Sequence, residues 1–92
     1  MEKLVNTCET LLNEKILNNY FVHPKHITIE IDDEALGFLI GMSGLSYEEI
    51  LVKLFEKRGC EKVKVEYLME EDLLTDPTRD VMYTYKISKE VA

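Results

Sequence analysis

A group of five acidic residues lies between Met69 and Asp80, in the stretch MEEDLLTDPTRD. Asp76-Pro77 breaks this stretch, so we expect a loop that joins two strands. Loops are exposed and tolerate functional side chains, and exposed carboxylates attract basic surfaces over a distance of about 10 Å. We therefore expect the loop to contact a basic protein surface. The predicted partner-binding residues are Glu70, Glu71, Asp72, Asp76 and Asp80.

A second feature is the stretch GFLIGMSG, in which three glycines lie between Gly37 and Gly44. Glycine weakens a helix or strand by about 0.5–1 kcal/mol, so this spacing indicates a backbone requirement. The pattern Leu36-Gly37-x-Leu39-Ile40-Gly41-x-x-Gly44 resembles the core of a KH domain. In that family a GXXG loop joins two helices and clamps the backbone of about four nucleotides. The resemblance implies an RNA-binding surface made by Gly41, Met42, Ser43, Gly44, Lys53 and Lys57.

The overall charge favours a different partner. The chain has 18 acidic against 11 basic residues, a net charge of −7 and a pI near 4.8. Nucleic-acid binding depends largely on Lys and Arg that displace counterions from phosphates. RNA-binding KH loops usually carry Lys or Arg between the two glycines, where this chain has Met42-Ser43. The charge thus favours a protein partner with a basic surface, such as the nucleic-acid channel of another protein.

These observations leave two functions open. Phage-encoded inhibitors, including anti-CRISPR proteins and nucleic-acid mimics, are similar to this chain in size and charge. The first hypothesis is therefore a small, acidic, non-catalytic protein-binding module of that inhibitor type, which engages a basic surface of a nucleic-acid-handling protein. The alternative is a KH-like single-stranded RNA-binding protein that uses Gly41–Gly44.

Catalytic and metal chemistry find little support in the sequence. His23 and His26 are two imidazoles near a turn, whereas zinc sites need three or four ligands. Cys8 and Cys60 each fall on an apolar face, which is typical of buried free thiols rather than of a disulfide. No serine or cysteine has a base at a recognisable spacing. We therefore expect no enzyme activity, no metal and no cofactor.

Hydrophobic periodicity predicts the elements that would position these residues. A first helix should run from the start of the chain to about Asn18, on Leu4, Cys8, Leu11, Leu12 and Ile16. Alternation predicts strands on Ile27–Ile31, Val63–Tyr67 and Val81–Ile87. A short helix should cover 35–40, and a longer one should start at a Ser46–Glu49 capping box and end at Gly59.

These elements predict an α+β two-layer sandwich in one domain, 1–92. A three-stranded antiparallel sheet would carry the helices on one face, in the KH-like order α-β-α-α-β-β. No apolar run approaches the roughly 18 residues that cross a bilayer, and the amphipathic N-terminus is unlike a signal peptide. We expect a soluble, cytoplasmic protein.

Overall fold

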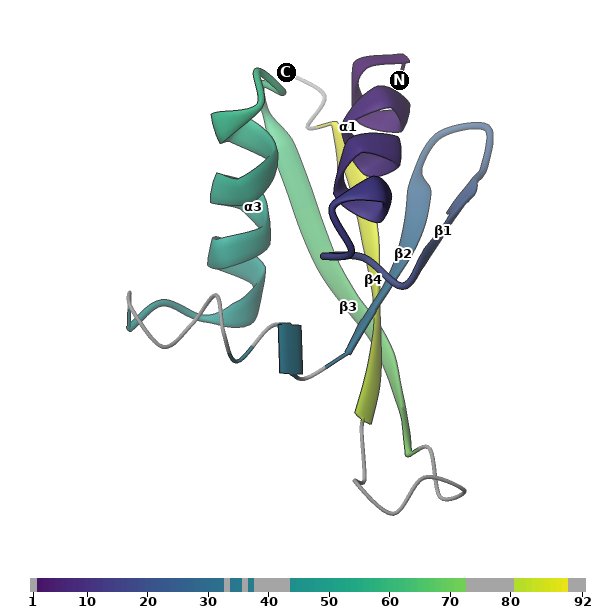
Figure 1. Ribbon diagram of the computed structural model, residues 1–92. Helices are drawn as coiled ribbons and strands as arrows, with labels where there is room; N and C mark the ends of the chain where they lie inside the picture. The colour runs from purple at the N-terminus through teal and green to yellow at the C-terminus, as the bar shows by residue number, and fades with distance from the viewer. Residues whose placement is uncertain (1, 33, 36, 38–43, 73–80, 90–92) are drawn as a thin grey trace.

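Two helices pack on one face of an antiparallel sheet in the computed structural model, which describes residues 2–32, 34–35, 37, 44–72 and 81–89 (Figure 1). The predicted α+β class and the antiparallel sheet are confirmed. The helices and strands in chain order are α1 (Glu2–Asn13), β1 (Asn19–Val22), β2 (Ile27–Asp32), α3 (Tyr47–Lys57), β3 (Val63–Asp72) and β4 (Val81–Lys89).

The described residues form a sheet of four strands in the order β1-β2-β4-β3, so the prediction of three strands was wrong. The missed strand is β1, which pairs antiparallel with β2 from Asn19↔Glu30 to Val22↔Ile27. It contains only four residues, and three of them are exposed. A strand this short, without alternating burial, has no period-2 signal for sequence analysis to detect.

Helix α1 ends at Asn13, earlier than the predicted boundary near Asn18. Lys15 adopts a left-handed φ of 63°, and its N–H donates to the carbonyl of Leu12 at 3.0 Å. The N–H of Ile16 donates to the carbonyl of Leu11 at 3.0 Å. This pair of hydrogen bonds is a Schellman motif, which normally uses glycine at the left-handed position. Because a lysine occupies it here, no residue type at this position marks the end of the helix.

Both ends of α3 follow the prediction. The Ser46 side chain accepts a hydrogen bond from the Glu49 N–H at 3.3 Å, which caps the helix N-terminus. At the other end Gly59 has a φ of 90°, and its N–H donates to the carbonyl of Glu56 at 3.0 Å. The N–H of Cys60 donates to the carbonyl of Phe55 at 3.1 Å, which completes a second Schellman motif.

The short helix expected at 35–40 is described only in part. Glu34, Ala35 and Gly37 have helical backbone, and the Asp32 carboxylate accepts a hydrogen bond from the Ala35 N–H at 2.8 Å. Asp32 therefore caps this turn. Leu36 and residues 38–43 lie outside the described residues.

One hydrophobic core lies between the helices and the sheet. In β2 the isoleucines are fully buried and alternate with partly exposed polar residues, as the pattern predicted. Tyr85 and Ile87 extend the same buried face onto β4. The helices contribute Leu4, Cys8, Leu11, Leu51 and Phe55, each fully buried.

The order of strands divides the fold into two similar halves. α1 precedes the antiparallel pair β1–β2, and α3 precedes the antiparallel pair β3–β4. The second strand of each pair lies at the centre, where β2 and β4 pair antiparallel, and the first strand of each pair lies at an edge. Two copies of an αββ unit would give this order if their second strands paired.

Candidate protein-interaction site

The first three predicted partner-binding residues lie in a strand and not in a loop. β3 continues to Asp72, and Glu70, Glu71 and Asp72 are register partners of Tyr83, Met82 and Val81 in β4. The predicted boundary of the loop, at Met69, was therefore wrong. Acidic residues are poor strand formers, and pairing with the β-prone residues of β4 overrides that preference. Asp76 and Asp80 lie outside the described residues.

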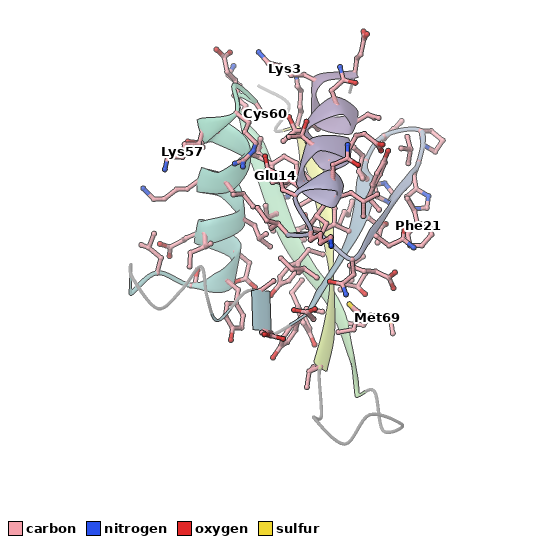
Figure 2. All side chains as sticks on the ribbon, viewed as in Figure 1. Lys3, Glu14, Phe21, Lys57, Cys60 and Met69 are labelled. Atoms are coloured by element: carbon pink, nitrogen blue, oxygen red, sulfur yellow. The ribbon has the colours of Figure 1, made fainter. Side chains whose placement is uncertain are left out.

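β3 is an edge strand, and it exposes apolar side chains next to these acids. Tyr67 and Leu68 are each 47% exposed and Met69 is 53% exposed. A β-bulge falls at this point, because Tyr67 pairs with Tyr85 while Met69 pairs with Thr84. Figure 1 shows β3 and β4 running on beyond the helices, and Figure 2 places Met69 on this lower part of the sheet. We call Tyr67, Leu68 and Met69 the β3 edge patch.

The edge patch is supported from the side of the helices by a chain of tyrosine rings. The Tyr67 ring meets the ring of Tyr85 edge-on, with centroids 5.8 Å apart. The ring centroid of Tyr85 lies 6.4 Å from that of Tyr83. The centroid of Tyr83 in turn lies 5.5 Å from that of Tyr47, at the start of α3. Contacts of this geometry between aromatic rings contribute about 0.5–1.5 kcal/mol each beyond burial. The chain of rings therefore holds Tyr67 in place while half of its surface stays in water.

Burial keeps the central ring of this chain, Tyr85, in its neutral form. Burial raises the pKa of the Tyr85 phenol above its ordinary value of 10.0, and the nearby Glu48 carboxylate and the other tyrosines raise it further. Neutral tyrosine rings beside carboxylates form an environment that attracts cations, because the ring faces carry partial negative charge. Lysine and arginine side chains are the protein groups that match it.

Sequence analysis did not identify the edge patch. The predicted strand ended at Tyr67 and Met69 was assigned to the acidic loop, so no exposed apolar residues were expected on a strand at this point. A signal was nevertheless present: Tyr67-Leu68-Met69 is an apolar run that breaks the alternation of Val63 and Val65 directly before the acids. A run of that kind places apolar side chains on both faces of the strand.

The residues implied by the KH resemblance are described only in part. Gly41, Met42 and Ser43 lie outside the described residues, and Gly44 has a left-handed φ of 66°. Lys53 and Lys57 are both exposed on α3. The groove beside Lys53, of about 370 Å³, is lined by three glutamates as well: its residues are Glu48, Glu49, Val52, Lys53 and Glu56. This lining does not favour a phosphate.

Two other cations of the same region have carboxylate partners. Arg58 forms an ion pair with Glu14 at 2.9 Å, and Lys64 forms one with Glu66 at 2.9 Å. The Lys64 contact holds the pKa of the Glu66 carboxyl below its ordinary value. Carboxylates from the turn after α1 and from β3 thereby compensate the charges of Arg58 and Lys64.

The remaining candidates for chemistry show no assembled site. Cys8 and Cys60 are both free and buried, and burial raises the pKa of the Cys8 thiol to about 12. The rings of His23 and His26 stack at the β1–β2 turn with centroids 4.5 Å apart. Burial lowers the pKa of His26, as do His23 and Lys86. Within the described ranges, no three His, Cys, Asp or Glu residues gather as metal ligands would.

Comparison of the chain with protein-family models, with curated proteins and with solved structures gives no match. In the part of the chain that the structure describes, no helix combines the length and apolar character needed to cross a membrane.

Proposed function

We propose that this protein is a small, acidic, non-catalytic module that binds a basic segment of a nucleic-acid-handling protein in the cytoplasm, as an inhibitor or nucleic-acid mimic would. The observation that carries the proposal is the β3 edge patch: Tyr67, Leu68 and Met69 are about half exposed on an edge strand. Three acidic residues follow them directly in the same strand, Glu70 to Asp72.

Strand addition is the binding mode that suits this surface. An edge strand carries unpaired N–H and C=O groups, so an extended segment of a partner can extend the sheet with main-chain hydrogen bonds. The apolar surface of Leu68 and Met69 would be covered by the partner, and the ring of Tyr67 would bind an arginine or lysine. The charges of the acidic residues would speed the encounter.

The charge favours a protein over a nucleic acid as the partner. A net charge of −7 repels phosphates at long range, and the groove beside Lys53 carries three glutamates. The same charges attract a protein surface that has evolved to hold nucleic acid. Mimicry of phosphates by carboxylates is the form of inhibition that this balance favours.

The test starts from a partner that the protein retains after nuclease treatment, purified and measured by stopped-flow association. Changing Glu70 and Glu71 to Gln and Asp72 to Asn should slow association and flatten its dependence on salt, with little effect on stability. A matched control also removes three negative charges, but away from β3: it changes Glu2, Glu56 and Glu61 to Gln. If both triple variants slow association equally, the charge acts globally and the β3 site is wrong.

A second variant tests the apolar surface separately from the charge. Leu68→Ser should increase the dissociation rate of the same partner, because the side chain is half exposed and the fold does not need it buried. Val22→Ser on the opposite edge strand, where Val22 is 54% exposed, is its control. A partner that dissociates faster from the Val22 variant alone would place the contact on β1.

A second candidate function is KH-like binding of single-stranded RNA. Its support is the order of the described elements on either side of Gly41–Gly44. β2 and the helical residues 34, 35 and 37 precede these glycines, and α3, β3 and β4 follow them. Lys53 and Lys57 also remain exposed on the helix that follows. The double change Met42→Asp and Ser43→Asp would repel phosphates. Loss of RNA crosslinks at an unchanged melting temperature would favour this function over the first.

A further inference from the structure

A second concave surface lies at the end of α3 remote from Gly44, where α1 approaches the turn after the helix. It is a groove of about 320 Å³ between the two helices. Figure 2 shows Lys3 and Cys60 near the top of the molecule, whereas Met69 lies near the lower part of the sheet. The groove is thus separate from the β3 edge patch. Its lining residues are Lys3, Asn6, Thr7, Thr10 and Arg58.

The lining has an unusual charge for this protein. Two of the lining residues are cationic, three are neutral and polar, and no acid is among them. In a chain with 18 acids and 11 bases, a cavity with this composition is unexpected. Lys3 belongs to α1 and Arg58 follows α3, so the two cations reach the groove from different helices.

The backbone of Gly59 makes room for the first cation. Its φ of 90° turns the chain away from α3, and a Cβ at this position would lie 3.0 Å from both Cε and Nζ of Lys3. Only a glycine leaves that space to the lysine side chain without displacing it. The ammonium group of Lys3 is therefore directed over the turn that carries Arg58 and Cys60.

Two contacts hold the second cation. One terminal nitrogen of Arg58 donates to the Glu14 carboxylate at 2.9 Å, and the other donates to the carbonyl of Leu54 at 3.4 Å. A guanidinium has five N–H donors in a fixed plane, so three remain for a ligand. The contact with Glu14 orients the group and also competes with any anion that approaches it.

The threonines form a fixed wall. Thr7 is only 5% exposed; its hydroxyl donates to the carbonyl of Lys3 at 2.8 Å and lies 3.3 Å from the Cys60 sulfur. The hydroxyl of Thr10 donates to the carbonyl of Asn6 at 3.1 Å. Because both hydroxyl protons are directed at backbone carbonyls, the donors left for a ligand are Lys3, Arg58 and the side-chain amide of Asn6.

We propose that this groove binds a small molecule through a phosphate group. Lysine as a point charge and arginine as a planar fork are the side chains that recognise phosphate, and a tetrahedral dianion can accept from both of them and from an amide at once. The volume suffices for a phosphate ester with a small organic part, at the lower end of ordinary ligand sites. The inference does not depend on the function proposed for β3.

Inorganic phosphate is the probe for a titration followed by ¹⁵N–¹H NMR at constant ionic strength. Saturable shifts should appear at residues 3–10 and 58–60. Lys3→Gln and Arg58→Gln should each weaken binding at least tenfold, whereas Lys25→Gln, which removes the same charge at the β1–β2 turn, should leave it unchanged. Shifts that never saturate, or equal weakening by Lys25→Gln, would overturn the proposal.

The variant Glu14→Gln distinguishes binding from a structural effect. It removes the anion that competes for Arg58, so phosphate should bind several-fold more tightly although the helices lose an ion pair. If the ion pair only held the helices in place, the same change would weaken binding or leave it unaltered. Either of these results would contradict the proposal, and the amide spectrum of each variant reports whether the fold is intact.

Discussion

Replacement of single glycines should change stability in opposite directions at two positions. Gly59 has a φ of 90° at the end of α3, whereas Gly37 lies in helical backbone, and no atom of the described residues lies within 4 Å of a Cβ added there. An L-residue in the left-handed region costs about 1–2 kcal/mol. In Gly59→Ala the Lys3 side chain must also move by a few tenths of an ångström, which is cheap because it is flexible and exposed. We therefore expect Gly59→Ala to lose about 1–2 kcal/mol.

Gly37→Ala should instead gain about 0.4–1 kcal/mol, since alanine restricts the unfolded chain and fits a helix. In a domain of this size each kcal/mol shifts the melting temperature by about 4–8 °C. Urea unfolding followed by circular dichroism measures both variants against the wild type. The reasoning fails if the urea midpoint of Gly59→Ala equals that of the wild type. It also fails if both variants move the midpoint in the same direction while the dependence of the unfolding free energy on urea stays unchanged.

Three further predictions concern the core, the histidine pair and the thiols. Phe55→Ala should lower the free energy of unfolding, measured in urea, by about 3–5 kcal/mol, because the ring is fully buried. Leu54→Ala should lower it less, because Leu54 is only partly buried. The reverse order would mean that the buried face of α3 is misassigned. His26 has a folded pKa below its ordinary 6.5, so the unfolded state binds the proton more readily and stability should fall as pH drops from 6.5 toward the folded pKa. In NMR titrations His23→Gln should raise the pKa of His26, and an unchanged value would show that the stacked partner is irrelevant. The Cys8 thiol, with a pKa of about 12, should not react with a disulfide reagent at pH 8 until the protein is unfolded; fast reaction in the native state would contradict its burial.

The sequence was most informative where local chemistry and tertiary packing agree. Alternation of isoleucines with polar residues identified β2, and the serine cap and Gly59 identified both ends of α3. Each of these signals depends on neighbouring residues alone. They were sufficient for the α+β class and for the helices on one face of an antiparallel sheet.

Features that no residue type marks in the local sequence could not be predicted. β1 is a strand only because β2 pairs with it, and β3 continues to Asp72 only because β4 supplies a partner. The left-handed Lys15 shows no local mark, since lysine is common within helices. The candidate site was missed for a similar reason: the exposure of Leu68 depends on which strand lies beside it, and periodicity contains no information about that.

The seam between β2 and β4 has a consequence for association. Within the sheet that the described residues form, β1–β2 and β3–β4 pair with each other at this seam, whose register runs from Ile27↔Ile87 to Asp32↔Met82. The two halves also meet through the Arg58–Glu14 ion pair and the contact of Thr7 with Cys60. If the seam opens, each αββ half exposes an inner strand that matches the inner strand of another molecule. Two chains can then exchange halves and rebuild the same contacts, which is domain swapping at little cost in enthalpy. Concentrated protein refolded from urea should therefore contain a dimer that dissociates slowly on dilution, with a circular dichroism spectrum identical to that of the monomer.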